Sequence, residues 1–259
     1  MHYFAPLPRP SQPELTIRLR EATVKDMLAI ADTQPELEEH ITTEYLNQLQ
    51  APETYSDARQ WTGDDRRLAV YWYALHTLPD TQMTLDYTCP RCDKALSYRL
   101  DCRDLADSST TLKGKPYREA VFKGEVLHIK PLTGKALEQL EHIKLALHPL
   151  DNHTAEYRHK KAELPLSEIT YCLDFVELNL EGDAKKQWLL QLTASEFTQL
   201  KQLISEKLAE LQHGLPSVMH EGQLQLTTQV PSCDCETQKN NDELTLFFPF
   251  RDYFQLPDI

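Results

Sequence analysis

The sequence predicts an α+β protein in which two β-hairpins, each tipped by a cysteine pair, are separated by a mostly helical insertion. Apolar and polar residues alternate on both sides of Cys89-Pro90-Arg91-Cys92 and again around Cys233-Asp234-Cys235, and such alternation indicates strands. Over much of the stretch between them, apolar residues instead recur every three or four positions, which indicates helices with one buried face. The chain has 259 residues, enough to bury a sizeable core.

The first part of the chain is predicted to hold an arm, a strand and helices. Residues 1–13 contain four prolines and run extended, either as a loose terminus or as an arm that lies on a neighbouring protein. Leu15, Ile17 and Leu19 alternate with polar residues and predict a strand. Three helices are then predicted, over 23–31, 36–50 and 64–78.

The predicted helix over 64–78 has clear boundaries. Its apolar residues fall on one face, which is typical of a helix packed on a core. Thr62 and Asp65 form a capping pair at its start, and Pro79 ends it. A hairpin is predicted next, over 83–101, with the first cysteine pair at its tip.

The insertion is predicted to begin with strands and to continue as helices. Residues 117–131 alternate, whereas residues 149–165 are polar and separate two helices. The predicted helices cover 134–147, 167–178, 183–192 and 194–213. The last is the strongest of them, because its apolar residues form one stripe and Thr193 with Glu196 forms a capping box.

Four of the six cysteines sit at the two predicted hairpin tips, which is the layout of a zinc ribbon. A tetrahedral zinc ion takes four soft ligands, so we expect Cys89, Cys92, Cys233 and Cys235 to bind one structural Zn²⁺. The CxxC pair is the stronger signal, because the second pair has the shorter CxC spacing. Four cysteine ligands leave no open position for a substrate, so the site is expected to be structural.

Two other interpretations of these cysteines stay open. A CxxC pair can carry redox chemistry, although such a pair normally opens a helix beside a βαβ unit, and here strands flank it. The hairpins could also form a ribbon that has lost its metal. Outside the set of four, Cys102 could be a substitute ligand, and Cys172 is expected to be a buried thiol on an apolar helix.

The cysteine pairs divide the chain into three predicted parts. A metal ion at the two tips would close a loop of about 140 residues and remove roughly 4–5 kcal/mol of unfolded-state entropy. The parts are an N-terminal arm, strand and helices (1–80), a split zinc ribbon (81–102 plus 220–250), and a mixed strand and helical insertion (103–219).

Composition argues against several classes of function. The net charge is −13 and no basic stripe is present, so we expect no nucleic-acid partner. Seven glycines assemble no phosphate-cradling loop. No apolar run approaches the length of about 18 residues that a membrane span needs, and the N-terminus lacks the charged and apolar regions of a secretory signal. We therefore expect a protein that neither enters a membrane nor is secreted.

No catalytic signature stands out. No serine or cysteine has the local sequence of a known nucleophile, and no carboxylate pair is distinguished by its spacing. His142, His148, His153 and His159 match no zinc-binding helix motif and are expected to be solvated or capping residues. We expect a protein that is not an enzyme and has no small-molecule substrate.

The stretch 246–254 is unusually aromatic, with five aromatic residues among nine. Such rings either cover the protein's own ribbon or a helix, or they form a docking surface for another protein. Both interpretations place apolar contacts near this end of the sequence.

The order of elements resembles the T-even-type phage baseplate protein family, which includes the baseplate hub assembly protein. The matching pieces are Leu85-Asp86-Tyr87-Thr88-Cys89-Pro90-Arg91-Cys92, Leu192-Thr193-Ala194-Ser195-Glu196-Phe197, Leu215-Pro216, His220, Cys233, Cys235 and the terminal phenylalanines. The chain departs from that family in its CxC pair and in a longer 103–165 region.

The resemblance implies a component or assembly factor of a phage-type contractile tail baseplate. Such a protein binds other tail or baseplate proteins and performs no chemistry, in the host cytoplasm during assembly or within the virion tail. Residues 1–13 and 246–254 are the expected docking segments. Two alternatives remain: a zinc-ribbon regulatory adaptor, for which the ribbon offers only Arg91, Lys94 and Arg99, or an enzyme with an unrecognised site.

Overall fold

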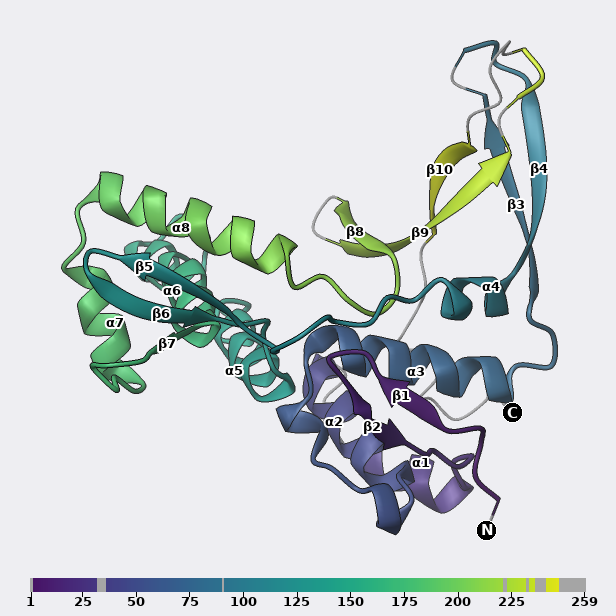
Figure 1. Cartoon of the computed structure of the whole chain (residues 1–259), viewed down its shortest axis with the longest axis horizontal. Coiled ribbons are helices and arrows are strands. Elements are labelled where there is room, and N and C mark those ends of the chain that lie inside the picture. Colours follow the sequence, from purple (N-terminus) through teal and green to yellow (C-terminus); the bar gives the residue numbers. More distant parts are fainter. Residues whose placement is uncertain are drawn as a thin grey trace.

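The protein is a mixed α+β structure built from small antiparallel sheets and helices. The computed structural model describes residues 2–31, 36–89, 91–220, 223–231, 233–235 and 241–246. Most of the buried apolar side chains in these residues belong to two separate clusters. One cluster unites the N-terminal elements with the two hairpins, and the other lies in the insertion, which extends to one side (Figure 1).

The N-terminal elements pack around the long helix α3. They are β1 (Leu7–Arg9), β2 (Gln12–Ile17), α1 (Val24–Ala31), α2 (Glu38–Leu49), the short 3₁₀ helices η1 (Pro52–Thr54) and η2 (Ala58–Gln60), and α3 (Gly63–Thr77). The predicted capping box of α3 is confirmed: the Thr62 hydroxyl accepts from the Asp65 N–H, and the Asp65 carboxylate accepts from the Thr62 N–H. The helix buries Leu68, Ala69 and Tyr71 in the first cluster.

The proline-rich arm belongs to this core. Residues Leu7–Arg9 pair antiparallel with β2, and Leu7 is buried in the first cluster. Arg9 and Ser11 are buried too, and the Phe4 N–H donates to the Leu19 carbonyl at 2.7 Å. The expectation of a loose terminus is therefore wrong for residues 2–13, because strand pairing and burial hold them against their own chain.

The two predicted hairpins are confirmed. The first consists of β3 (Gln82–Thr88) and β4 (Ala95–Asp101), in register from Gln82↔Asp101 to Thr88↔Ala95. The second is formed by β9 (Gln223–Pro231) and β10 (Asn241–Leu246), with β8 (Ser217–His220) on the other side of β9. A short helix after β4, α4 (Cys102–Asp107), was not predicted; its Leu105 joins the first cluster.

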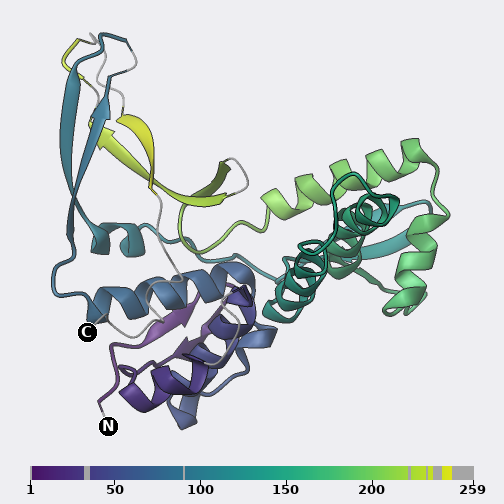
Figure 2. The same cartoon turned by 180° about the vertical axis from the view of Figure 1, so that it is seen from behind.

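The insertion combines one small sheet with four helices. Its elements are β5 (Arg118–Phe122), β6 (Glu125–Ile129), α5 (Gly134–Leu145), α6 (Ala155–Cys172), β7 (Leu173–Phe175), α7 (Asp183–Leu190) and α8 (Ala194–Ala209). The strands follow the order β5-β6-β7. Helices α6 and α8 contact the sheet and form the second cluster with it, and Figure 2 shows both from behind. The predicted capping box of Thr193 and Glu196 is confirmed at the start of α8.

Two predictions in the insertion were wrong. Helix α6 starts at Ala155, capped by Thr154, although residues 149–165 were expected to lie between helices. Its first turns are polar because they are largely exposed, so they lack the apolar stripe that marks a packed helix. The helix predicted over 167–178 ends at Cys172, because Leu173–Phe175 pair with β6 as a third strand.

A close backbone contact joins the insertion to the N-terminal part. The Gly134 N–H donates to the Trp61 carbonyl at 2.8 Å, and the Gly63 N–H donates to the Leu132 carbonyl at 3.0 Å. A Cβ atom at Gly134 would lie 1.9 Å from Nη1 of Arg66 and 2.6 Å from the Ala58 carbonyl oxygen. Glycine is needed here because a side chain would push the two parts apart.

Candidate metal centre

The first cysteine pair sits in a tight turn between β3 and β4. The Cys89 N–H donates to the Lys94 carbonyl at 3.0 Å, and the Asp93 N–H donates back to the Cys89 carbonyl at 3.0 Å. Asp93 has φ of 56°, a left-handed conformation that aspartate tolerates better than most side chains. This conformation closes the turn and brings Cys89 and Cys92 to the same side of it.

The second pair follows the end of β9 and lies against the first hairpin. The Tyr87 hydroxyl on β3 donates to the carbonyl of Pro231 on β9 at 3.0 Å. This bond joins residues 144 positions apart in the chain. It places the turn that carries Cys233 and Cys235 beside the tip of the first hairpin, as Figure 1 shows.

The four predicted ligands come together in space. The Sγ atoms of Cys89 and Cys235 are 3.7 Å apart, and those of Cys92 and Cys233 are 3.6 Å apart. All four sulfurs lie within 4.8 Å of one another. These separations exceed the S–S bond of a disulfide, about 2.05 Å, and all four cysteines are free.

The spacing suits a metal ion at the centre of the cluster. A tetrahedral ion with metal–sulfur bonds of about 2.3 Å holds its sulfurs about 3.8 Å apart, close to the separations found here. Four thiolates would fill the coordination shell and leave no position for water or substrate. The cluster could therefore hold a metal ion in a closed site.

Backbone contacts favour ionisation of one thiol in the cluster, and neighbouring thiols disfavour ionisation of another. Cys89 and Cys233 are buried, while Cys92 and Cys235 are exposed. The backbone N–H groups of Arg91 and Cys92 point at the Cys89 sulfur and lower the pKa of that thiol to about 7. Hydrogen bonds with the neighbouring thiols of Cys92 and Cys233 raise the pKa of Cys235 to about 12. A bound cation would favour the thiolate form of all four.

The other candidate residues lie elsewhere. Cys102 starts α4 and is outside the cluster, so a role as substitute ligand has no geometric support. The buried thiol predicted at Cys172 is confirmed, and burial raises its pKa to about 12. The four histidines singled out in the sequence, His142, His148, His153 and His159, are all exposed.

Sequence reasoning missed a buried polar network beside α3. The Asp65 carboxylate accepts hydrogen bonds from the N–H and the hydroxyl of Ser11. It also accepts one from the N–H of Thr62. The Thr62 hydroxyl lies 2.7 Å from Nε2 of His213, whose Nδ1 is 2.6 Å from the Leu211 carbonyl. Since a carbonyl only accepts, Nδ1 carries a proton and donates it to Leu211.

This network contains serine, histidine and aspartate, and its hydrogen bonds join three segments of the chain. Asp65 and the side chain of His213 are fully buried, and each has its hydrogen-bond partners inside the protein. The network ties the N-terminal arm to α3 and to the segment that leads into β8. No local sequence motif predicts this network, because Ser11, Asp65 and His213 are far apart in the sequence.

Comparison of the chain with protein-family models, with curated proteins and with solved structures found no match. Within the described residues, none of the helices combines the length and the apolar character needed to cross a lipid bilayer.

Proposed function

We propose that Cys89, Cys92, Cys233 and Cys235 hold one structural zinc ion and so complete a split zinc ribbon. The single observation that carries this proposal is the convergence of four sulfurs within 4.8 Å of one another at the meeting point of two hairpins. Thiolates are soft ligands, and a tetrahedral set of four is the typical environment of structural zinc.

The zinc ion would supply stability rather than chemistry. It would close a loop of about 140 residues, which corresponds to roughly 4–5 kcal/mol of unfolded-state entropy. The chain contributes the orientation of the four sulfurs, through the turn at Asp93 and the bond from Tyr87 to Pro231. The insertion between the hairpins would be held as one large loop of the ribbon.

We further propose that the protein is a non-catalytic, protein-binding component or assembly factor of a phage-type contractile tail baseplate. The order of hairpins, cysteine pairs and the helix that begins at Ala194 supports this role through the family resemblance. A closed metal site and a net charge of −13 suit a protein that acts through its surfaces. Action in the host cytoplasm during assembly, or in the virion tail, belongs to the same proposal.

Part of the first docking segment expected from the sequence is buried in the protein itself. In residues 2–13 the side chains of Leu7, Arg9 and Ser11 are buried in their own chain, which leaves the exposed remainder for a partner. Leu246 is buried in the first cluster. Residues 247–254 lie outside the described part of the chain.

Affinity purification of the tagged protein from the cells that produce it tests this role. We expect mass spectrometry of the co-purified material to find tail or baseplate proteins. The matched control is the double variant Cys233→Ser/Cys235→Ser, which should recover fewer of them if the ribbon orders the binding surface. Recovery of transcription proteins instead would favour the regulatory adaptor, and a partner list without tail proteins would overturn the baseplate role.

A further inference from the structure

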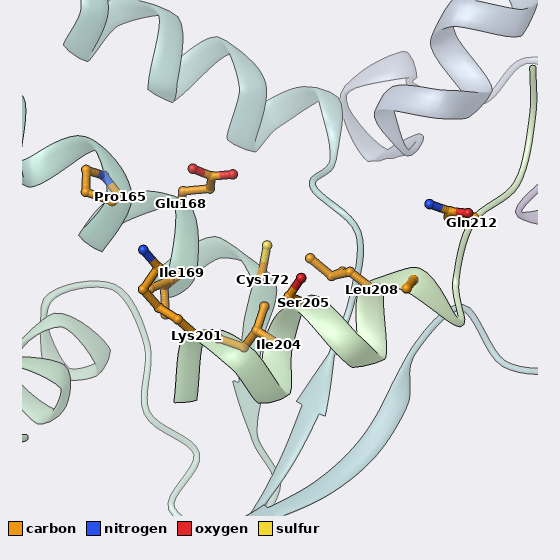
Figure 3. Close-up of a pocket in the computed structure, with 10 residues that line it drawn as sticks. Pro165, Glu168, Ile169, Cys172, Lys201, Ile204, Ser205, Leu208 and Gln212 are labelled. Atoms are coloured by element: carbon orange, nitrogen blue, oxygen red, sulfur yellow. The ribbon is translucent and has the colours of Figure 1, made fainter. Parts of the chain in front are cut away.

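An open apolar groove follows helix α6, away from the cysteine cluster. Three adjoining hollows of about 540, 240 and 660 Å³ form it. The first lies between α6 and α8 (Figure 3), where Glu168 and Cys172 of α6 face Leu208 of α8. The hollows adjoin one another, because Glu168 contributes to the lining of all three.

The lining of the groove is mainly apolar. Leucines of α5, of α6 and of the segment just before α5 line its widest hollow, and isoleucine and leucine side chains of α6 and α8 line the hollow at its other end. These residues are Leu132, Leu137, Leu140, Leu145, Leu164, Ile169, Ile204 and Leu208. A row of apolar side chains along paired helices is the kind of surface that accepts the apolar face of another helix.

The rim of the widest hollow is acidic. Five glutamates line it, against Arg67, Lys144 and one histidine, His148; the glutamates are Glu36, Glu38, Glu39, Glu141 and Glu168. Arg67 is already engaged with Asp64 at 2.5 Å. The rim therefore presents a surplus of negative charge to whatever enters the groove.

Two of these glutamates are available for a partner. Glu141 is used inside the protein, because its carboxylate accepts from the N–H groups of Glu39 and His40 at the start of α2. Glu39 pairs with Arg66 at 3.0 Å. Glu36 and Glu168 are exposed, both line the hollow, and neither forms an ion pair with any residue in the described ranges.

We propose that this groove is the docking site for a basic amphipathic helix of a partner protein. The helix would place its apolar side chains on the leucines and its lysine or arginine side chains beside Glu36 and Glu168. Apolar burial would supply affinity, and the acidic rim would select basic partners and speed their association. The groove would be the surface through which the proposed protein-binding role operates, so the inference rests on that role. Binding at the groove can nevertheless be tested without any tail protein.

The test uses the purified full-length chain and a fluorescein-labelled synthetic peptide of leucine and lysine, patterned as an amphipathic helix. Fluorescence anisotropy measures its affinity. We expect the double variant Glu36→Lys/Glu168→Lys to weaken binding by about tenfold or more, the effect of losing two charge contacts. The matched control, Glu53→Lys/Glu181→Lys, makes the same change in net charge at exposed sites outside the groove, and it should weaken binding by less than about threefold.

Hydrogen exchange with and without the peptide locates the contact. Protection is expected in α5, α6 and α8, whose side chains line the groove. Equal weakening by both double variants would overturn the proposal, as would equally tight binding of a peptide with glutamate in place of lysine. Protection confined to other elements would overturn it too. None of these outcomes bears on the baseplate role, because the peptide is not a tail protein.

Discussion

The N-terminal core and the core of the insertion bury different kinds of side chains. Around α3, buried charged groups are paired within the protein: Arg20 with Asp26 at 2.5 Å, and Arg66 with Glu39 at 3.0 Å. In the insertion, the second cluster is built from apolar side chains that include Leu127 and Leu200.

The difference follows from how each core is assembled. The first core gathers segments from distant parts of the chain: the arm, α3, α4 and the strands after Gly214. Hydrogen bonds and ion pairs are directional, so they specify which of these segments meet. The insertion is nearly continuous in sequence, and non-directional apolar burial is enough to close it. We therefore expect the first core to depend on particular polar atoms and the second on buried volume.

Removal of the buried carboxylate of Asp65 should produce the largest effect. Asp65→Ala leaves the N–H and hydroxyl of Ser11 without their acceptor, and we expect a loss of roughly 3–5 kcal/mol in the free energy of unfolding. Urea denaturation measures it. The neighbouring substitution Asp64→Ala removes a partly exposed ion pair with Arg67 and should cost less than about 1 kcal/mol. Similar losses for the two variants would contradict the comparison.

Loss of buried volume should dominate in the insertion. Leu200 is fully buried on α8, and Leu200→Ala should cost about 3 kcal/mol through lost burial and the cavity left behind. Leu200→Met keeps the volume and should cost less than about 1.5 kcal/mol. Urea denaturation measures the loss of stability in both variants. Equal losses would mean that this core depends on the exact shape of the Leu200 side chain and not on its volume.

The ion pair of Arg20 and Asp26 should make the first core sensitive to acid. The hydrogen bond from Arg20, assisted by Thr23, holds the pKa of Asp26 well below its usual range. A depressed folded-state pKa contributes stability above the unfolded value of about 3.9, and that contribution is lost as the pH falls below it. Asp26→Asn should therefore cost roughly 2 kcal/mol at pH 7 and progressively less toward pH 3.

Thermal unfolding of both proteins across this pH range measures the difference. The control is Glu156→Gln, which removes an exposed pair with Lys160 in the insertion and should change stability by less than about 0.5 kcal/mol at either pH. A cost for Asp26→Asn that stays constant with pH would show that the carboxylate charge is not what stabilises this core.

The turn at the first cysteine pair offers the smallest effect and the only expected gain. Asp93 has φ of 56°, which costs most side chains about 1 kcal/mol, so Asp93→Gly should raise stability by up to about that amount. Asp86→Gly, in the middle of β3, should lower it by roughly 0.5–1 kcal/mol, since the strand gains nothing from glycine. A loss at position 93 would show that the Asp93 side chain contributes contacts beyond its backbone conformation.

Local sequence patterns predicted much of this architecture, and the failures have a common cause. The capping boxes at Thr62 and Thr193 and the two hairpins follow from nearby residues and were confirmed. The convergence of the cysteine pairs could be predicted because metal binding requires four ligands together. The third strand, β7, could not, because its pairing depends on β6, far away in sequence.

The buried network and the groove were beyond sequence reasoning for the same reason. His213 resembles any other histidine until the fold brings it to Thr62, 151 positions away. The start of α6 was missed because a helix exposed on most sides has no apolar stripe. The apolar pattern of a segment shows which of its faces will be buried. It does not show which other segments that face will contact, and these features depend on such contacts.

The metal content of the purified chain tests the central claim most directly. Native mass spectrometry should find one zinc ion per chain, absent from Cys233→Ser/Cys235→Ser and retained by Cys102→Ser, whose cysteine lies outside the cluster. Wild-type protein without metal, or a cysteine-pair variant that keeps its zinc, would contradict the proposal that Cys89, Cys92, Cys233 and Cys235 join the two hairpins through one ion.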